Sequence, residues 1–162
     1  MNKQNLEQRM YCLVLRHLSP INKGIQCTHA CEQYGEFFRN EADYRKYIEE
    51  DKTLIMLEGG SSIDMYIIEE KLIQKGVQFY AFKEPDLMNL TTAICFLADE
   101  RIWNFEQYPD IKSTFEIITN SVESNEKIEN SFIDYINSFI DYIGGVHNYT
   151  KLQIIFGKRL AT

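Results

Sequence analysis

The residues best placed to do chemistry lie near the start of a predicted helix. The apolar run from Tyr11 to Leu15 indicates a strand, and Ser19 and Pro20 then suit the N-cap and first position of a helix. Lys23 falls at the end of the first helical turn, beside backbone N–H groups that have no partner within the helix. Such a lysine can hold an anion or a developing oxyanion, and a solvated surface lysine is the ordinary alternative.

The same helix, predicted from Pro20 to about Phe38, carries a polar arc beside its apolar stripe. Gln26 and His29 lie on this polar arc, which leaves them free to line a cleft. Gln26 is suited to positioning a substrate. Histidine titrates near neutrality, so His29 is a candidate general base, although it can also simply bond to a neighbouring group.

A second group of polar residues precedes the last predicted strand of the sheet. Asp86 follows a proline in a loop, where it could position or deprotonate a water molecule or could form an ordinary Asx turn. Thr92 begins the strand and could hydrogen-bond that water or a substrate. The adjacent Thr91 points to the opposite face, so only one of the two threonines can line a given cleft.

Two blocks of sequence resemble the peptidyl-tRNA hydrolase 2 family. Lys23 and the segment from Gln26 to Ala30 (QCTHA) are similar to the lysine and Gln-x-x-His-Ala signature of the family's first helix. The segments 84–87 (EPDL) and 90–94 (LTTAI) are similar to the family's Asp and Thr block before its last core strand. The blocks follow the family's order, and the resemblance covers residues 10–100.

This resemblance implies an enzyme that hydrolyses the ester bond of peptidyl-tRNA and releases peptide and tRNA, without a metal or other cofactor. The residues that it assigns to catalysis are Lys23, Asp86 and Thr92. Those that it assigns to substrate binding are Gln26, His29, Arg16 and Thr91. The alternative is a catalytically silent protein of similar fold that binds RNA or a protein partner.

The net charge of −7 favours the silent alternative, because proteins that bind tRNA usually present a basic patch to its phosphates. A local patch is nevertheless compatible with an acidic total. Six basic residues in the first third of the chain either form such a patch or are ordinary solvated charges. They are Arg16, Lys23, Arg39, Arg45, Lys46 and Lys52.

The alternation of strands and helices predicts an α/β fold with a mixed four-stranded sheet. Strands are predicted at residues 10–16, 53–57, 77–82 and 91–98, and the run 53–57 is apolar enough for a central strand buried on both faces. The short loop before the fourth strand excludes a parallel crossover from the third. The resemblance implies helices on both faces of the sheet, a three-layer α/β/α arrangement. We expect one domain (1–162), with a core at 10–100 and an extension at 101–162.

The extension contains a predicted helix at 113–143 with a seven-residue repeat, in which 130–136 recurs as 137–143. The repeat places Phe132, Ile136, Phe139 and Ile143 on one face. We expect this face to pack on the core, with a homodimer contact as the alternative. Residues 152–156 are predicted to form a last strand.

The four cysteines predict no metal site from sequence alone. Cys27 and Cys31 are four residues apart with His29 between them, but His29 points away from the cysteine stripe and a tetrahedral site needs two further ligands. No apolar stretch has the length of a signal peptide or membrane span, so we expect a cytoplasmic protein with no membrane partner and reduced thiols.

Overall fold

The computed structural model describes residues 6–103 and 125–161, with only the backbone described for 125–129, 131 and 132. The strands are β1 (Gln8–Leu15), β2 (Thr53–Gly60), β3 (Tyr80–Glu84) and β4 (Leu90–Asp99). The longer helices are α1 (Pro20–Phe38), α3 (Ser62–Gln74), α5 (Asn125–Tyr142) and α6 (Val146–Ile155). Short helical segments are α2 (Ala42–Lys46), η2 (Tyr47–Asp51), η3 (Pro85–Leu87) and η4 (Glu100–Ile102).

The four strands form one mixed sheet in the order β2-β1-β4-β3. Strand β1 pairs in parallel with β2, whereas β4 is antiparallel to both β1 and β3. The predicted mixed four-stranded sheet is therefore confirmed, as is the absence of a parallel crossover between its last two strands.

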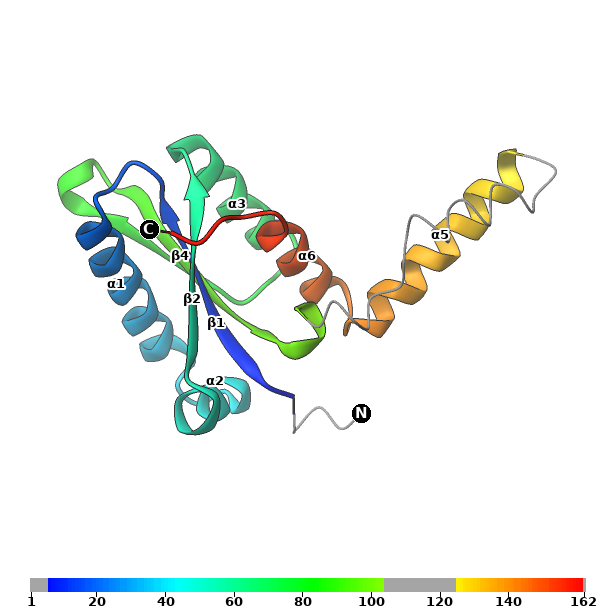
Figure 1. The fold of residues 1–162 in the computed structure, drawn as a ribbon, viewed down its shortest axis with the longest axis horizontal. Helices are drawn as coiled ribbons and strands as arrows, with labels where there is room; N and C mark the ends of the chain where they lie inside the picture. The colour runs from blue at the N-terminus through cyan, green and yellow to red at the C-terminus, as the bar shows by residue number, and fades with distance from the viewer. Residues whose placement is uncertain (1–5, 104–124, 162) are drawn as a thin grey trace.

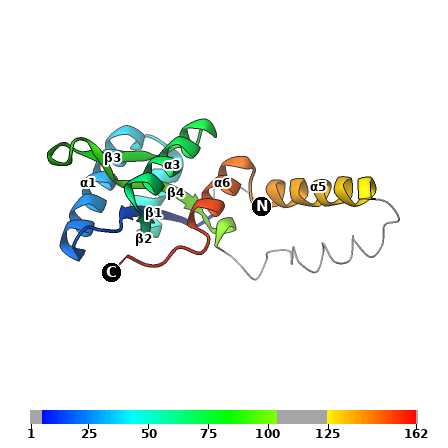
Figure 2. The same cartoon turned by 90° about the horizontal axis from the view of Figure 1, so that it is seen from above.

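Helices cover the two faces of this sheet, with α1 on one face and α3 and α6 on the other (Figure 1; Figure 2). Alternate β1 side chains supply the two cores, because successive residues of a strand point to opposite faces. Cys12 and Val14 pack with the α1 side, and Leu13 packs with Met65 and Leu72 of α3. Among the described residues, no helix has the length and apolar character needed to cross a membrane.

Strand β2 is one of the two outer strands of the sheet, and its prediction as a central strand is wrong. Its outer edge is partly covered by the segment after α6. The backbone N–H of Glu58 donates to the carbonyl of Arg159 (2.9 Å), and the N–H of Ala161 donates to the carbonyl of Met56 (3.0 Å). Because the segment after α6 covers part of this edge, the sequence of β2 is as apolar as that of a central strand.

The strand predicted at 152–156 is also wrong, because those residues belong mostly to α6. Leu152 and Ile154 are buried in the core on the α3 side of the sheet. A short apolar run does not distinguish a buried helix from a strand by its periodicity. The antiparallel pairing with β2 instead occurs further along, at Leu160 opposite Leu57.

Helix α5 extends away from the sheet, and its C-terminal end joins the core (Figure 1; Figure 2). Phe139 and Ile143 are buried in the same cluster as Leu152 of α6. Asp134 and Asp141, on the other side of the repeat, are exposed. The side chain of Phe132 and the expected helix before residue 125 lie outside what the structure describes.

Asp99 links the end of β4 to α6 through charged hydrogen bonds. Its carboxylate accepts from Arg101 Nε and Nη2 (both 2.8 Å) and from Asn148 Nδ2 (2.9 Å). Burial alone would raise the pKa of Asp99, but these donors outweigh it and hold the pKa below its usual value. The carboxylate therefore stabilises the fold above its unfolded pKa of about 3.9, and this contribution is lost as the pH falls through the lower folded pKa.

We expect Asp99→Ala to lower the free energy of unfolding at pH 7 by about 2–4 kcal/mol, because it leaves the buried amide of Asn148 and the partly buried guanidinium of Arg101 without their acceptor. The difference from the parent should shrink as the pH falls below 4. Urea unfolding at pH 7 and at pH 3 measures both. Asp134→Ala, which removes an exposed carboxylate, is the control. An equal loss of stability at the two pH values would contradict the assignment.

Candidate functional site

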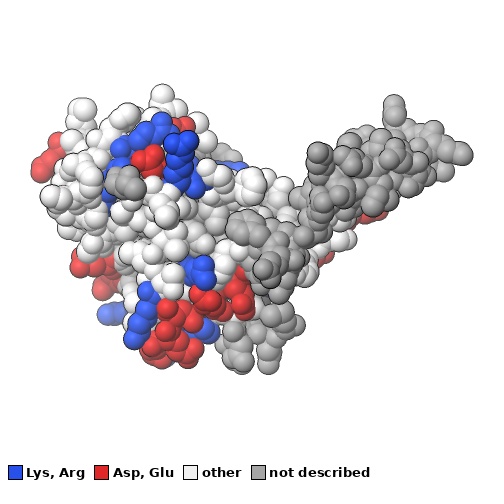
Figure 3. All heavy atoms as spheres, viewed as in Figure 1, with Lys and Arg blue, Asp and Glu red and all other residues white. Residues whose placement is uncertain are grey.

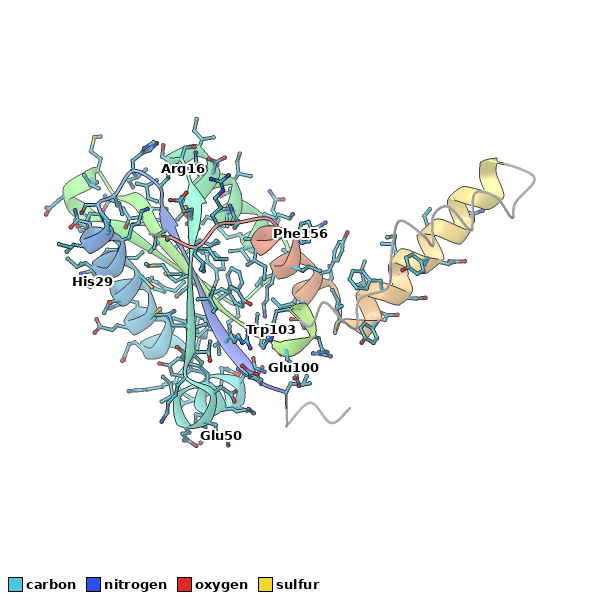
Figure 4. The ribbon with its side chains drawn as sticks, viewed as in Figure 1. Arg16, His29, Glu50, Glu100, Trp103 and Phe156 are labelled. Atoms are coloured by element: carbon cyan, nitrogen blue, oxygen red, sulfur yellow. The ribbon has the colours of Figure 1, made fainter. Side chains whose placement is uncertain are left out.

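One end of the sheet collects most of the residues singled out from the sequence. Strands β1 and β2 end there, as does β3, while the antiparallel β4 begins there. Helix α1 starts beside them, and the η3 turn joins β3 to β4 at the same end (Figure 1). Arg16 lies at this end and Glu50 at the other (Figure 4). The fold therefore places both matched blocks at the same end of the sheet.

Lys23 is a buried lysine held by a carboxylate from β2. Only 4% of Lys23 is exposed, and its Nζ lies 3.1 Å from Oε1 of Glu58. Arg16 Nε approaches the other oxygen of Glu58 at 3.7 Å, although the arginine is itself exposed. The helix start is as predicted, because Ser19 Oγ accepts from the N–H of Asn22 (3.3 Å). Lys23 is thus part of a charged cluster and is not a solvated surface lysine.

A chain of hydrogen bonds joins the two matched blocks. The fully buried Thr92 donates from Oγ1 to Oε1 of Gln26 (2.7 Å), and Gln26 Nε2 donates to Oε2 of Glu84 (2.6 Å). The hydroxyl fixes the orientation of the glutamine amide, which then holds the carboxylate. We call these three residues the Thr92–Gln26–Glu84 relay. Gln26 follows Lys23 by three residues, so the two side chains neighbour each other on α1.

Thr91 lies on the opposite face of β4 from the relay. Its Oγ1 donates to Oε2 of Glu69 (2.7 Å), and Lys83 Nζ pairs with the other oxygen of Glu69 (2.9 Å). The structure therefore separates Thr91 from Thr92, and only Thr92 shares a site with the first block.

Asp86 and His29 stand apart from the relay. Asp86 is exposed on η3, and the relay does not include it. Beyond it, Met88 and Asn89 adopt positive φ angles (55° and 57°), a conformation that few residues other than glycine adopt. His29 is exposed on α1 and stacks on Phe82 of β3, with ring centroids 4.9 Å apart (Figure 4).

Basic residues surround Glu58, and two of them come from the far end of the sequence. Arg16, Lys158 and Arg159 line a groove together with Glu58 and Gly157. Figure 3 shows Lys and Arg atoms around acidic atoms at this end of the molecule. Lys158 Nζ donates to the carbonyl of Gly59 (3.2 Å), and burial lowers the pKa of this lysine. We call Arg16, Lys158 and Arg159 the basic rim.

Only part of the predicted basic patch contributes to this region. Arg16 and Lys23 lie here, whereas Lys46 is held at the other end of the sheet by Asp51 (2.7 Å). Arg39 pairs with Glu36 on α1. The sequence analysis did not identify Lys158 and Arg159, because no local sequence pattern indicates that the segment after α6 lies beside β2. It also missed Glu58 and Glu84, although both are charged residues close to the end of a predicted strand.

A separate polar cavity of about 340 Å³ lies at the opposite end of the sheet. Its lining includes Asp43, Asp99, Arg101, Asn148 and Lys151. None of the residues predicted to form the site lines it. Burial lowers the pKa of Lys151. Asp99, Arg101 and Asn148, which line this cavity, are also the residues that connect β4 to α6. Part of its polarity therefore follows from the fold.

No model of a known protein family matches the chain, and no curated protein matches it. Lys23, the relay and the basic rim are the features of the described residues that bear on function.

Proposed function

We propose that the protein hydrolyses the ester bond of peptidyl-tRNA. The observation that carries this proposal is the hydrogen bond from Thr92 to Gln26, which joins one residue from each of the two blocks that resemble peptidyl-tRNA hydrolase 2. In this proposal the fold is the three-layer α/β/α arrangement of that family, with 101–162 as an extension of the same domain. The enzyme acts in the cytoplasm, where its substrate is made.

The proposed chemistry needs an activated water and a stabilised tetrahedral oxyanion. Lys23 and the backbone N–H groups at the start of α1 supply positive charge for the oxyanion. Asp86, on the exposed turn before β4, positions or deprotonates the water. Thr92 acts through Gln26, whose amide it orients toward the carboxylate of Glu84.

The basic rim supports a nucleic-acid substrate despite the acidic total charge. Arg16, Lys158 and Arg159 line one groove beside Lys23's partner Glu58. Phosphate contacts by Lys and Arg supply most of the sequence-independent affinity for nucleic acids. In this proposal the rim binds backbone phosphates of the tRNA while the ester lies near Lys23.

The test is release of peptide from purified N-blocked aminoacyl-tRNA, comparing two matched variants. Thr92→Val and Thr91→Val each replace one buried hydroxyl by a methyl group on the same strand. We expect Thr92→Val to slow release by about 10²-fold, because Gln26 loses the donor that orients it. Thr91→Val should keep the parent rate, since its hydroxyl bonds to Glu69 on the other face. Equal rates in the two variants would contradict the role of the relay.

The second candidate function is a catalytically silent protein that binds RNA. The salt bridge between Lys23 and Glu58 favours it, because a lysine already paired with a carboxylate is less available to an oxyanion. A parent protein that binds tRNA in filter-binding or gel-shift experiments, but releases no peptide, would establish this alternative.

A further inference from the structure

All four cysteines of the chain gather where α1 packs on the sheet. Cys12 comes from β1, Cys27 and Cys31 from α1, and Cys95 from β4. The Sγ atoms of Cys12, Cys27 and Cys31 lie within 4.8 Å of one another. Cys95 lies outside this group of three, but it is the cross-strand partner of Cys12, and its Sγ donates to the carbonyl of Ala30, the residue before Cys31. The elements β1, α1 and β4 thus each contribute at least one thiol to the same cluster between α1 and the sheet.

We propose that these four cysteines form a binding site for one zinc ion. Four thiolates are a common ligand set for structural zinc, which prefers a tetrahedral arrangement. With Zn–S bonds of about 2.3 Å, neighbouring sulfurs stand about 3.8 Å apart, so the Sγ atoms of Cys12, Cys27 and Cys31 need to close by at most about 1 Å. Cys95 Sγ needs to turn toward them. In this proposal, rotations of the cysteine side chains supply the movement.

The positions of the thiols suit entry of an ion and its retention. Cys12, Cys27 and Cys95 are buried, whereas Cys31 is partly exposed and opens the site to solvent. Each thiol that binds loses its proton, so one zinc ion bound by four thiolates releases four protons. Cys95 Sγ, which donates to the carbonyl of Ala30 (3.2 Å), gives up that hydrogen bond when its proton leaves. Neither Lys23 nor the relay takes part, so the site is independent of the proposed hydrolysis.

The ordinary alternative is that four reduced cysteines pack as small apolar side chains, which buried cysteines often do. The two possibilities differ in a direct measurement. The reduced full chain, freed of metal, is titrated with Co²⁺, which reports tetrahedral thiolate ligands through its visible and charge-transfer absorption, and then with Zn²⁺. We expect one Co²⁺ per chain, displacement by one Zn²⁺, and a melting temperature raised by either ion.

Variants decide which residues bind the ion. Cys31→Ser should lose the Co²⁺ absorption and the ion-dependent rise in melting temperature. Because Cys31 is only partly buried, this variant should otherwise melt like the metal-free parent. His29→Ala, which removes the histidine between the two helical cysteines, should keep both signals. Loss of the signals in His29→Ala, or no charge-transfer band in the parent at one equivalent of Co²⁺, would overturn the site. An unchanged spectrum in Cys95→Ala would overturn the assignment of the fourth ligand.

Discussion

Asp86→Asn should slow peptide release by about 10²–10⁴-fold, the range typical of losing a positioned general base. The substitution keeps the size of the side chain and removes its charge. Asp86 is exposed on η3, so the melting temperature should stay close to that of the parent. Release from N-blocked aminoacyl-tRNA and thermal melting measure the two effects.

Two further variants make this result specific. Glu49→Gln removes an exposed carboxylate at the opposite end of the sheet and should leave the rate unchanged. Glu84→Gln removes the carboxylate that Gln26 Nε2 holds at 2.6 Å. If Glu84→Gln loses the activity and Asp86→Asn retains it, the base is Glu84 and the assignment of Asp86 is wrong.

Phe139→Ala should lower the free energy of unfolding by about 3–5 kcal/mol, as large truncations in a core do. Phe139 is only 5% exposed and packs in the cluster that includes Ile143 and Leu152. Its ring also meets Tyr149 edge-on, with centroids 6.4 Å apart. The side chain therefore connects α5 to α6 and to the core beneath it.

Thermal melting together with sedimentation distinguishes this packing from a contact between two copies. If Phe139 packs within one chain, the variant melts earlier and its oligomeric state stays that of the parent. If the repeat joins two chains, the variant dissociates and each subunit melts like the parent, which would contradict the packing seen here. Ile133→Ala, at an exposed position of the same helix, is the matched control and should change neither property.

The elements that depend on local signals could be predicted from the sequence. Ser19 and Pro20 mark the start of α1, and the helix spans the predicted residues because its apolar stripe is continuous. The loop between β3 and β4 is too short for a parallel crossover, so the antiparallel pairing of these strands could be predicted. Where one pattern of apolar residues fits two different structures, the sequence could not distinguish between them. The apolar run 152–156 fits a helix or a strand, and the run 53–57 fits a central strand or a covered edge.

In the candidate site, too, features set by neighbouring residues could be predicted, and contacts between distant residues could not. Alternation along β4 correctly separated the faces of Thr91 and Thr92, because it needs only the period of a strand. The partners of the predicted residues are distant in sequence. Glu58 reaches Lys23 from 35 residues away, and Glu84 reaches Gln26 from 58 residues away. Such pairs follow from the order of strands in the sheet, which no local pattern specifies.

The segment that supplies Lys158 and Arg159 also protects the sheet from other copies of the chain. An open outer strand presents unpaired N–H and C=O groups, which can template edge-to-edge aggregation. Residues 159–161 occupy part of that edge on β2, next to an apolar run in which Leu54 remains 47% exposed. Any change that detaches this segment would therefore expose the edge of β2 to other copies of the chain, so self-association would accompany the loss of the basic rim.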